Sequence, residues 1–593
     1  MTAGRSVGPA IAGLVVWGGL GAALLLVLGG HVFGLPPLGD LLDPADGLYR
    51  TARRAVPPAE AEVSLPALDA PVTVLLDDRG VPHIFASSDR DAVVAFGYVT
   101  ARDRLFQLDF LPRVASGRLS ELFGPASIGA DRFLRRTGME LGARRNAVRI
   151  IEEDGIERRL VQWFADGVNA YVDALAPEDL PFEFRLLGVK PDRYTVLHAA
   201  RLMQYFAYDL TYRTDVAGYG QLRSQLAPED YALLYPHHSR LFVPIIPEAG
   251  GGAAPQQTAG NAPAERAGAV LARLAEEQAA LRGTAAEGFV HGKGSNNWVV
   301  GGARSATGRP ILAGDMHLRL TLPSIWYEAH LVSPSMNSYG VAAPGTPLPI
   351  EAFTEQLAWA FTNTGADVID HYALDVDRQR MCYRYQDTCR PLEAVPDTIR
   401  VRGGEAVIDT LYYSHFGPVM LDDSGAVAVR WVAHDTSRTL QALWHMHHAD
   451  DLDAFADALT RWDTPAQNIV QADTGGAIAI RSTGYLPIRR AGHGRGLLDG
   501  TGDAFEWIGR IPFEELPQSR NPDQGFLTST NQQPADSTYP YYLGHDWRDS
   551  YRSLRIDTLL RARPRHGAED LMAYQADVHA VQRDLFVPFL DTL

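Results

Sequence analysis

The sequence predicts an α+β protein in which a helix-rich first part and a strand-rich second part are joined by a spacer. In the first part, apolar residues such as Val93, Phe96 and Leu105 recur at the spacing of amphipathic helices. From Ser295 onward, short segments such as NNWVVGG and QLAWAFTNTG indicate strands. Between the two parts, residues 247–294 are small and polar apart from one short Ala-rich helix. That composition is typical of a linker or of a peptide that is removed.

Length and composition exclude several classes of protein. The 593 residues include 54 Lys and Arg, 71 Asp and Glu and only 2 Cys, with a formal net charge of −17. Such a chain is neither disordered nor dependent on a network of disulfides. Nucleic acid is excluded as a partner, because phosphate binding needs clustered Lys and Arg, and the sequence has no such cluster.

The first element is an uncharged segment near the N-terminus. Residues 11–28, IAGLVVWGGLGAALLLVL, are long and apolar enough to cross a bilayer as one helix. This run is longer than in most cleavable signal peptides, and no small-residue cleavage site follows it. We therefore expect residues 1–39 to be an uncleaved signal-anchor, with a removed signal peptide as the alternative. Both place the remaining chain on the extracytoplasmic, periplasmic side, membrane-anchored in the first case and secreted in the second.

The next elements are a linker and two predicted hairpins. A Pro- and Ala-rich linker, 40–70, leads into the helix-rich part, 71–246, which opens with two strands around the turn DDRG. In the strand-rich part, Cys382 and Cys389 flank YRYQDT, so a tight hairpin allows a cross-strand disulfide. Two reduced cysteines are the alternative. Their spacing does not fit a zinc site, which needs more ligands nearby.

Ser295 directly follows Gly294 at the point where the spacer becomes a strand. A Gly-Ser pair alone says nothing about catalysis, and the sequence here is not a nucleophile elbow, G-x-S-x-G. Cleavage before Ser295 would change this, because its new α-amine, with an ordinary pKa of about 7.7–8, is a base for the serine hydroxyl. Removal of the spacer would therefore create a nucleophile and its base together.

Several motifs of the chain follow one another in an informative order. GSNNWVVGGARSATGRPILAGDMH begins the strand-rich part, and AFGYVTARDRLFQLDFLPRVASGRLSELFG lies upstream. WAFTNTGADVID, DTPAQNIVQAD, GFLTSTNQQP and YRSLRI follow downstream. Together they resemble the penicillin acylase family, N-terminal-nucleophile amidohydrolases that include acyl-homoserine-lactone and cephalosporin acylases. The resemblance implies an αββα sandwich, with a helical α chain, 71–246, wrapped on a catalytic β chain, 295–593. It also implies removal of the spacer 247–294 by autocatalytic cleavage between Gly294 and Ser295.

The resemblance further assigns roles to five residues. Ser295 would be the nucleophile, and the backbone N–H of Asn363 and the side-chain amide of Asn468 would stabilise the oxyanion. Arg489 would lie near the amine of the nucleophile. The alternatives are that Asn468 bends a loop and that Arg489 is a solvated charge. At the position of His317, penicillin G acylases carry Gln, whereas lactone and cephalosporin acylases carry His. His317 therefore favours acyl-homoserine lactones or other aliphatic N-acyl compounds over penicillin G.

The GADVID segment is similar to the calcium-binding turn of the family. The carboxylates of Asp367 and Asp370 and the carbonyl of Ile369 would bind a structural calcium ion, for which oxygen ligands are suited. The remaining acidic ligand would come from the first chain, where Asp215 is the best match and Asp209 its rival. The alternative is a solvated loop without metal, and no organic cofactor is expected.

A second metal hypothesis rests on His445, His447 and His448 in WHMHHADD, because imidazole binds transition metals. These histidines lack the H-E-x-x-H spacing and precede a helix that is expected to start near Leu452 with Asp451 as its N-cap. A surface His-rich loop is therefore favoured over a metal site.

The leading functional hypothesis is an amidohydrolase that matures from a zymogen into a heterodimer of α and β chains. It would transfer an acyl group from an N-acylated small molecule to Ser295 and then to water. The alternatives are a metal-dependent hydrolase and a non-catalytic, membrane-tethered binding protein of the same fold. The final segment QRDLFVPFLDTL resembles an interior part of the family's second chain, so we expect the β chain 295–593 to be C-terminally incomplete.

Overall fold

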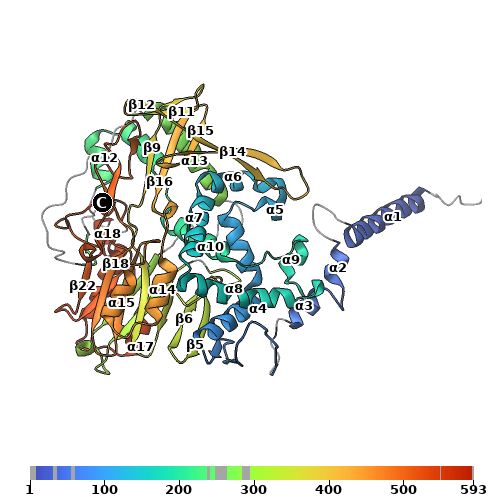
Figure 1. The fold of residues 1–593 in the computed structure, drawn as a ribbon, viewed down its shortest axis with the longest axis horizontal. Helices are drawn as coiled ribbons and strands as arrows, with labels where there is room; N and C mark the ends of the chain where they lie inside the picture. Colours follow the sequence, from blue (N-terminus) through green and yellow to red (C-terminus); the bar gives the residue numbers. More distant parts are fainter. Residues whose placement is uncertain are drawn as a thin grey trace, which may run out of the picture.

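A computed structural model describes most of the chain, and its body is built of four layers (Figure 1). The described residues are 8–30, 37–54, 56, 60–236, 241–246, 264–282, 294–318, 320–547 and 549–590. Helices cover one face of a nine-stranded sheet, a three-stranded sheet packs on its other face, and further helices cover the three-stranded sheet. This order of layers confirms the predicted αββα sandwich and its α+β class.

Helix α1, Gly8–Gly29, extends away from the body of the molecule (Figure 1). It is followed by the short helices α2, Leu38–Leu42, and α3, Leu48–Arg54. Among the residues whose side chains the structure describes, no helix is long and apolar enough to cross a membrane. The side chains of residues 11–13 lie outside the described residues, so the signal-anchor at residues 11–28 stays a prediction.

The helix-rich part opens with the hairpin that the sequence predicts. Strands β1, Thr73–Leu76, and β2, Pro82–Phe85, pair in antiparallel orientation. The helices that follow are α4 (Asp89–Ala115), α5 (Ser120–Phe123), α6 (Ile128–Arg136), α7 (Met139–Glu153), α8 (Ile156–Ala174), α9 (Phe182–Leu187), α10 (Val196–Thr211), α11 (Val216–Gln225) and α12 (Pro228–Leu234). Helix α4 begins after Ser88, whose hydroxyl accepts a hydrogen bond from the N–H of Asp91.

Helices α4 and α8 pack along each other and form the core of this layer. Val93, Phe96 and Leu105 on α4 are all buried, as their spacing predicts. The ring centroid of Phe96 lies 5.7 Å from that of Phe164 on α8, in an edge-to-face contact. The apolar stripes of the first part are therefore helix–helix contacts.

The described part of the predicted spacer is a helix that packs on the rest of the molecule. Helix α13, Ala264–Arg282, contacts α6 and α11, and Val270, Leu271 and Leu274 belong to the same core as these helices. Thr214 is also hydrogen-bonded to Gln278. The Ala-rich helix is thus present as predicted, but it is part of the core. Residues 247–263 and 283–293 of the spacer lie outside the described residues.

The nine-stranded sheet combines strands from both parts of the chain. Its order is β1-β2-β5-β6-β7-β8-β17-β18-β22. The new strands are β5 (Tyr327–Ser333), β6 (Met336–Ala342), β7 (Glu351–Phe353), β8 (Leu357–Asn363), β17 (Gln467–Asp473), β18 (Ile478–Thr483) and β22 (Gln518–Arg520). Strand β2 pairs in parallel with β5, so the hairpin of the first part is hydrogen-bonded into the sheet of the second part.

The three-stranded sheet carries the start of the predicted catalytic chain. It has the order β23-β3-β4, with β23 (Phe526–Ser529), β3 (Gly294–Val300) and β4 (Ile311–His317). Strands β3 and β4 face β8 and β17, which makes the two sheets a sandwich. Helices α16 (Tyr551–Arg561) and α17 (Ala568–Gln575) cover its outer face, while α14 (Thr439–His447) and α15 (Leu452–Leu459) cover β8 and β17 from the other side.

A further sheet extends from the sandwich beyond β8. Its order is β13-β14-β15-β16-β9-β20, with β13 (Glu393–Ile399), β14 (Val407–Ser414), β15 (Gly417–Asp422), β16 (Gly425–Trp431), β9 (Ile369–Ala373) and β20 (Leu497–Asp499). The remaining elements are β10 (Val376–Asp377), β11 (Cys382–Tyr385), β12 (Thr388–Pro391), β19 (Pro487–Arg489), β21 (Trp507–Arg510) and α18 (Val581–Leu590). Strands β11 and β12 form the predicted hairpin, and a disulfide joins Cys382 to Cys389 across it.

Candidate active site

Ser295 is the second residue of β3, at the edge of the sandwich. Opposite residues in the ladder are Gly294 and His317, and Ser295 and Met316. Because side chains alternate along a strand, Ser295 shares a face with Asn297. The amide of Asn297 donates to the carbonyl of Ala360 on β8, so this face is turned toward the nine-stranded sheet.

The main chain of Ser295 is held by two side chains from the segment after β23. Its N–H donates to Oδ1 of Asn531 at 2.7 Å, and its carbonyl accepts from Nη1 of Arg552 at 2.6 Å. Arg552 also donates to Oδ1 of Asn531 at 2.9 Å. Nδ2 of Asn531 in turn donates to the carbonyl of Asn363 at 2.9 Å. Asn531 therefore links the predicted nucleophile to the predicted oxyanion residue Asn363.

The backbone conformation of Asn531 and the small size of Gly294 both suit their positions next to Ser295 and Arg552. Asn531 has a φ of 66°, a left-handed conformation that Asn tolerates better than most residues. A Cβ on Gly294 would lie 3.3 Å from the guanidinium of Arg552, which is tighter than an ordinary contact. The residue before Ser295 is therefore limited in size by the same arginine that holds the Ser295 carbonyl.

His317 lies on the opposite face of β3 and β4 from the Ser295 side chain. Its Nε2 is 2.8 Å from the carboxylate of Asp315 and 3.3 Å from Nδ2 of Asn296. Oδ1 of Asn296 accepts from Arg552, so these groups form one hydrogen-bonded network. Burial raises the pKa of Asp315, but the hydrogen bond with His317 and its charge outweigh burial and hold the pKa below its usual range. The structure thus places His317 beside the Gly294–Ser295 bond and gives it a carboxylate partner.

The structure places Asn468 apart from the main-chain contacts of Ser295. Asn468 is the second residue of β17 and is fully buried. Its Nδ2 donates to the hydroxyls of Thr362 and Ser529 at 3.2 and 3.3 Å, and its Oδ1 accepts from Ser482 at 2.6 Å. These hydrogen bonds satisfy the side-chain amide of Asn468 inside the sandwich. The side-chain amide that contacts Ser295 is that of Asn531.

Arg489 belongs to a different group of contacts from those of Ser295. Its guanidinium is 1% exposed and contacts Asp367 and Asp370, and the arginine that contacts Ser295 is Arg552. Although burial raises it, the pKa of Asp367 is held well below its usual range by the charge of Arg489. Burial keeps the pKa of Asp370 above its usual range despite the same arginine.

The other predicted calcium ligands do not complete a cation site. Asp215 is exposed at the start of α11, and Asp209 is half-buried on α10. Among the described residues, no group of three or more His, Cys, Asp or Glu side chains is arranged to hold a metal ion. The same finding applies to the three histidines of WHMHHADD.

Those histidines do not form the surface loop that the sequence favours. His445 and His447 belong to α14, and His447 is buried with its ring nitrogens near Ser338 and the carbonyl of Pro349. Burial lowers the pKa of His447 to about 4, so it is a neutral core residue at neutral pH. The N-cap of the following helix is confirmed, because Asp451 accepts hydrogen bonds from the first turn of α15.

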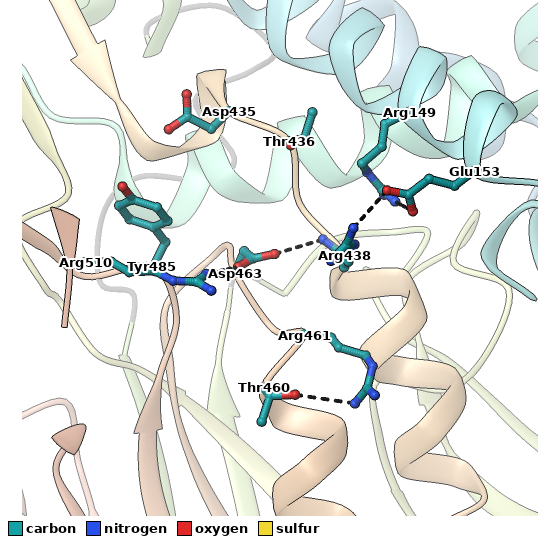
Figure 2. Close-up of a pocket in the computed structure, with 10 residues that line it drawn as sticks. All are labelled: Arg149, Glu153, Asp435, Thr436, Arg438, Thr460, Arg461, Asp463, Tyr485 and Arg510. Atoms are coloured by element: carbon teal, nitrogen blue, oxygen red, sulfur yellow. Dashed lines mark hydrogen bonds and ion pairs between the residues drawn. The ribbon is translucent and has the colours of Figure 1, made fainter. Parts of the chain in front are cut away.

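A polar cavity lies apart from Ser295, at the junction of α7 with the second part of the chain. It has a volume of about 740 Å³, and Figure 2 shows Arg438 between Glu153 and Asp463 in it. Arg438 donates to Glu153 at 2.9 Å, and Arg510 donates to Asp463 at 3.1 Å. These guanidinium groups are paired with carboxylates within the cavity wall. The cavity shares no lining residue with the contacts of Ser295.

Asn531 and Arg552 lie in segments that carry the family resemblance, but the resemblance gave neither residue a role. Asn531 lies in GFLTSTNQQP and Arg552 in YRSLRI, 236 and 257 residues after Ser295. An Asn soon after a strand is a candidate for a left-handed turn, and this is the available signal for Asn531, two residues after β23. No local pattern marks Arg552, because its role comes from the packing of α16 on the three-stranded sheet.

Comparisons with known proteins cover most of the chain. Residues 71–593 match the model of the family described as penicillin amidase. The penicillin acylase 2 proenzyme of Pseudomonas sp. (strain SE83) is 31% identical over 542 residues, covering 88% of this chain and 66% of its own length. The acyl-homoserine lactone acylase QuiP of Pseudomonas aeruginosa is 26% identical over 563 residues, with 91% and 63% covered. The chain thus spans just under two thirds of the length of these relatives.

Comparison with solved structures also finds similar proteins. The thermostable penicillin G acylase of Alcaligenes faecalis is 22% identical, with a TM-score of 0.45 over 50% of this chain and 55% of the other.

Proposed function

Because the chain belongs to the penicillin amidase family, we propose that the protein is a self-processing acylase whose nucleophile is Ser295. The observation that carries this proposal is the position of Asn531, which accepts the N–H of Ser295 and donates to the carbonyl of Asn363. One side chain thereby joins the proposed cleavage point to the proposed oxyanion site.

In the proposed maturation, the Ser295 hydroxyl attacks the carbonyl carbon of Gly294 and an ester replaces the peptide bond. Water then hydrolyses the ester and leaves Ser295 with a free α-amine. That amine stays within reach of Oδ1 of Asn531, which already accepts the N–H of Ser295. The guanidinium of Arg552 disfavours a second positive charge nearby and so favours the neutral, basic form of the amine.

In the proposed hydrolysis, the α-amine takes the hydroxyl proton of Ser295 as the oxygen attacks the substrate amide. The oxyanion receives hydrogen bonds from the backbone N–H of Asn363 and from Nδ2 of Asn531. Such donors are each worth roughly 10²–10³ in rate. The amine product leaves with the proton, and water then releases the acid from the acyl-serine. Nδ2 of Asn531 lies 2.9 Å from the Asn363 carbonyl, so both donors are at one end of β8.

We propose an N-acylated amine with an aliphatic acyl chain as the substrate. His317 supports an acyl-homoserine lactone or a similar compound over penicillin G, because lactone acylases carry His at this position. Relatives named as penicillin acylase and as acyl-homoserine lactone acylase are both similar to this chain. Amine release from a matched series of acyl-homoserine lactones and penicillin G tests the preference.

The test of the nucleophile is intact-mass analysis of the purified protein and of Ser295→Ala. The parent is expected as two chains, the second of which begins at Ser295, whereas Ser295→Ala remains one chain without activity. Ser324→Ala, a change at an exposed serine, is the control and is expected to be processed normally. Normal cleavage and hydrolysis by Ser295→Ala would overturn the proposal.

We also propose that the two chains stay together as a heterodimer outside the cytoplasm. The parallel pairing of β2 with β5 supports the heterodimer, because it joins the two chains within one sheet. The Cys382–Cys389 disulfide supports an oxidising compartment. Co-elution of both chains on gel filtration under native conditions tests the heterodimer, and separate elution contradicts it.

A further inference from the structure

The turn that the resemblance assigns to calcium already contains a positive charge. Nε of Arg489 donates to Oδ2 of Asp370 at 2.7 Å, and its Nη2 donates to the carbonyl of Asp367 at 3.0 Å. The same Nη2 lies 3.2 Å from Oδ1 of Asp367. The guanidinium therefore contacts both carboxylates that are expected to bind calcium.

The remaining capacity of these carboxylates is largely filled by other donors. Oδ2 of Asp367 accepts from the N–H of Gly494 at 2.8 Å and from the hydroxyl of Tyr542 at 2.9 Å. Oδ2 of Asp370 also accepts from the indole of Trp507. Oδ1 of Asp370 is buried and has no hydrogen-bond partner among the residues that the structure describes. One such oxygen is far fewer than the roughly six to eight that calcium takes.

The space near the third expected ligand is closed by main chain. A Cβ on Gly494 would lie 2.3 Å from Oδ1 of Asp367 and 2.7 Å from the carbonyl oxygen of Ile369. These two oxygens therefore converge on the backbone of Gly494. The aromatic rings of Trp507 and Tyr542 lie 5.7 and 5.6 Å from the guanidinium carbon of Arg489 and enclose it further.

We propose that Arg489 is the resident cation of this site and that the protein folds without calcium. Its planar group bridges two carboxylates and a carbonyl, a geometry that suits guanidinium better than ammonium. The bridge fixes the turn between β8 and β9, which begins directly after Asn363. This inference does not depend on the proposed acylase activity.

The first experiment measures thermal unfolding and metal content of the full-length protein. After purification without added metal, we expect about 0.1 equivalent of calcium or less per protein by elemental analysis, well below the one equivalent of an occupied site. The apparent Tm is expected to be the same in EDTA and in added calcium chloride. One bound equivalent of calcium, or a lower Tm in EDTA, would overturn the proposal.

The second experiment compares Arg489→Met with Arg490→Met. Removal of Arg489 leaves two buried carboxylates without their cation, so its apparent Tm is expected to fall by about 5 °C or more. Arg490 is the matched control, because it follows directly in sequence and its side chain is 53% exposed. Arg489→Lys is expected to recover part of the loss. An unchanged Tm in Arg489→Met contradicts the proposal. If that variant does not fold, the wild-type measurements with calcium and EDTA still decide.

Discussion

Two polar clusters lie on either side of the turn after β8, and each is organised by one arginine. The Ser295 cluster consists of Ser295, Asn363, Asn531 and Arg552, and the Asp370 cluster consists of Asp367, Asp370, Arg489, Trp507 and Tyr542. The Ser295 cluster is partly exposed and binds main chain. The Asp370 cluster is buried and pairs opposite charges. A substrate could reach the hydrogen-bonding groups of the Ser295 cluster, whereas the partners in the Asp370 cluster are buried and fixed.

The largest effect is expected from replacing two asparagines, one at the proposed reaction site and one in the core of the sandwich. Asn531→Ala should lower turnover by about 10²–10³-fold, because it removes the proposed oxyanion donor beside Ser295. Asn468→Ala should leave turnover nearly unchanged but lower the free energy of unfolding by about 1–3 kcal/mol, because its buried hydroxyl partners lose their bonds. Steady-state kinetics and thermal unfolding of both variants distinguish them. The opposite assignment of effects would contradict the comparison.

The arginines provide the next test. Arg552→Met should slow processing at Ser295 by roughly 10–100-fold, because a charged hydrogen bond to the Ser295 carbonyl is lost. Its apparent Tm should change little, in contrast to Arg489→Met. The rate is measured by following the precursor mass after synthesis. A Tm loss in Arg552→Met as large as in Arg489→Met would mean that both arginines are structural.

A smaller effect is expected at the residue before the nucleophile. Gly294→Val places a branched side chain against the guanidinium of Arg552, so processing should slow by about tenfold through misplacement of the cleaved bond. The folded state should keep its Tm, because this end of β3 is partly exposed. Gly502→Ala serves as a control, because a Cβ there meets no atom within 4 Å and the backbone is not left-handed. Equal processing rates for all three proteins would contradict the crowding argument.

The smallest effect concerns pH dependence. The pKa of Asp315 in the folded protein is below its usual range, so its stabilising effect is present above pH 4 or so and is lost as pH falls through the folded pKa. Because Asp315 is only half-buried, Asp315→Asn should cost less than about 1 kcal/mol at pH 7. The variant should also lose less stability than the parent between pH 5 and pH 3. Asp523→Asn, an exposed change, should behave as the parent in both measurements.

Much of the fold was predictable because it depends on local pattern. The first hairpin, the buried faces of α4 and α8 and the cap of α15 follow from spacing and turn residues within one segment. The ordered motifs also identified the family, and they placed Ser295 at the start of a strand and Asn363 at the end of another.

The partners in the two clusters were not predictable from local pattern. Asn468 lies within a strand and Asn531 shortly after one, and only the left-handed backbone of Asn531 and the packing of β23 on β3 direct one of them to Ser295. Arg489 was expected near an amine or in solvent. It is buried instead because β19 brings it to carboxylates more than a hundred residues upstream.

The packing of α13 limits what the proposed cleavage before Ser295 would accomplish. The buried side chains of Val270, Leu271 and Leu274 each contribute on the order of 1.5–3 kcal/mol to keeping this helix in place. Cutting the Gly294–Ser295 bond removes none of these contacts. The spacer also stays covalently joined to the first chain after this cut, so it could leave only after a second cleavage nearer residue 246. Cleavage before Ser295 and removal of the spacer would then be separate steps, and a protein cut only before Ser295 would keep α13 in its core.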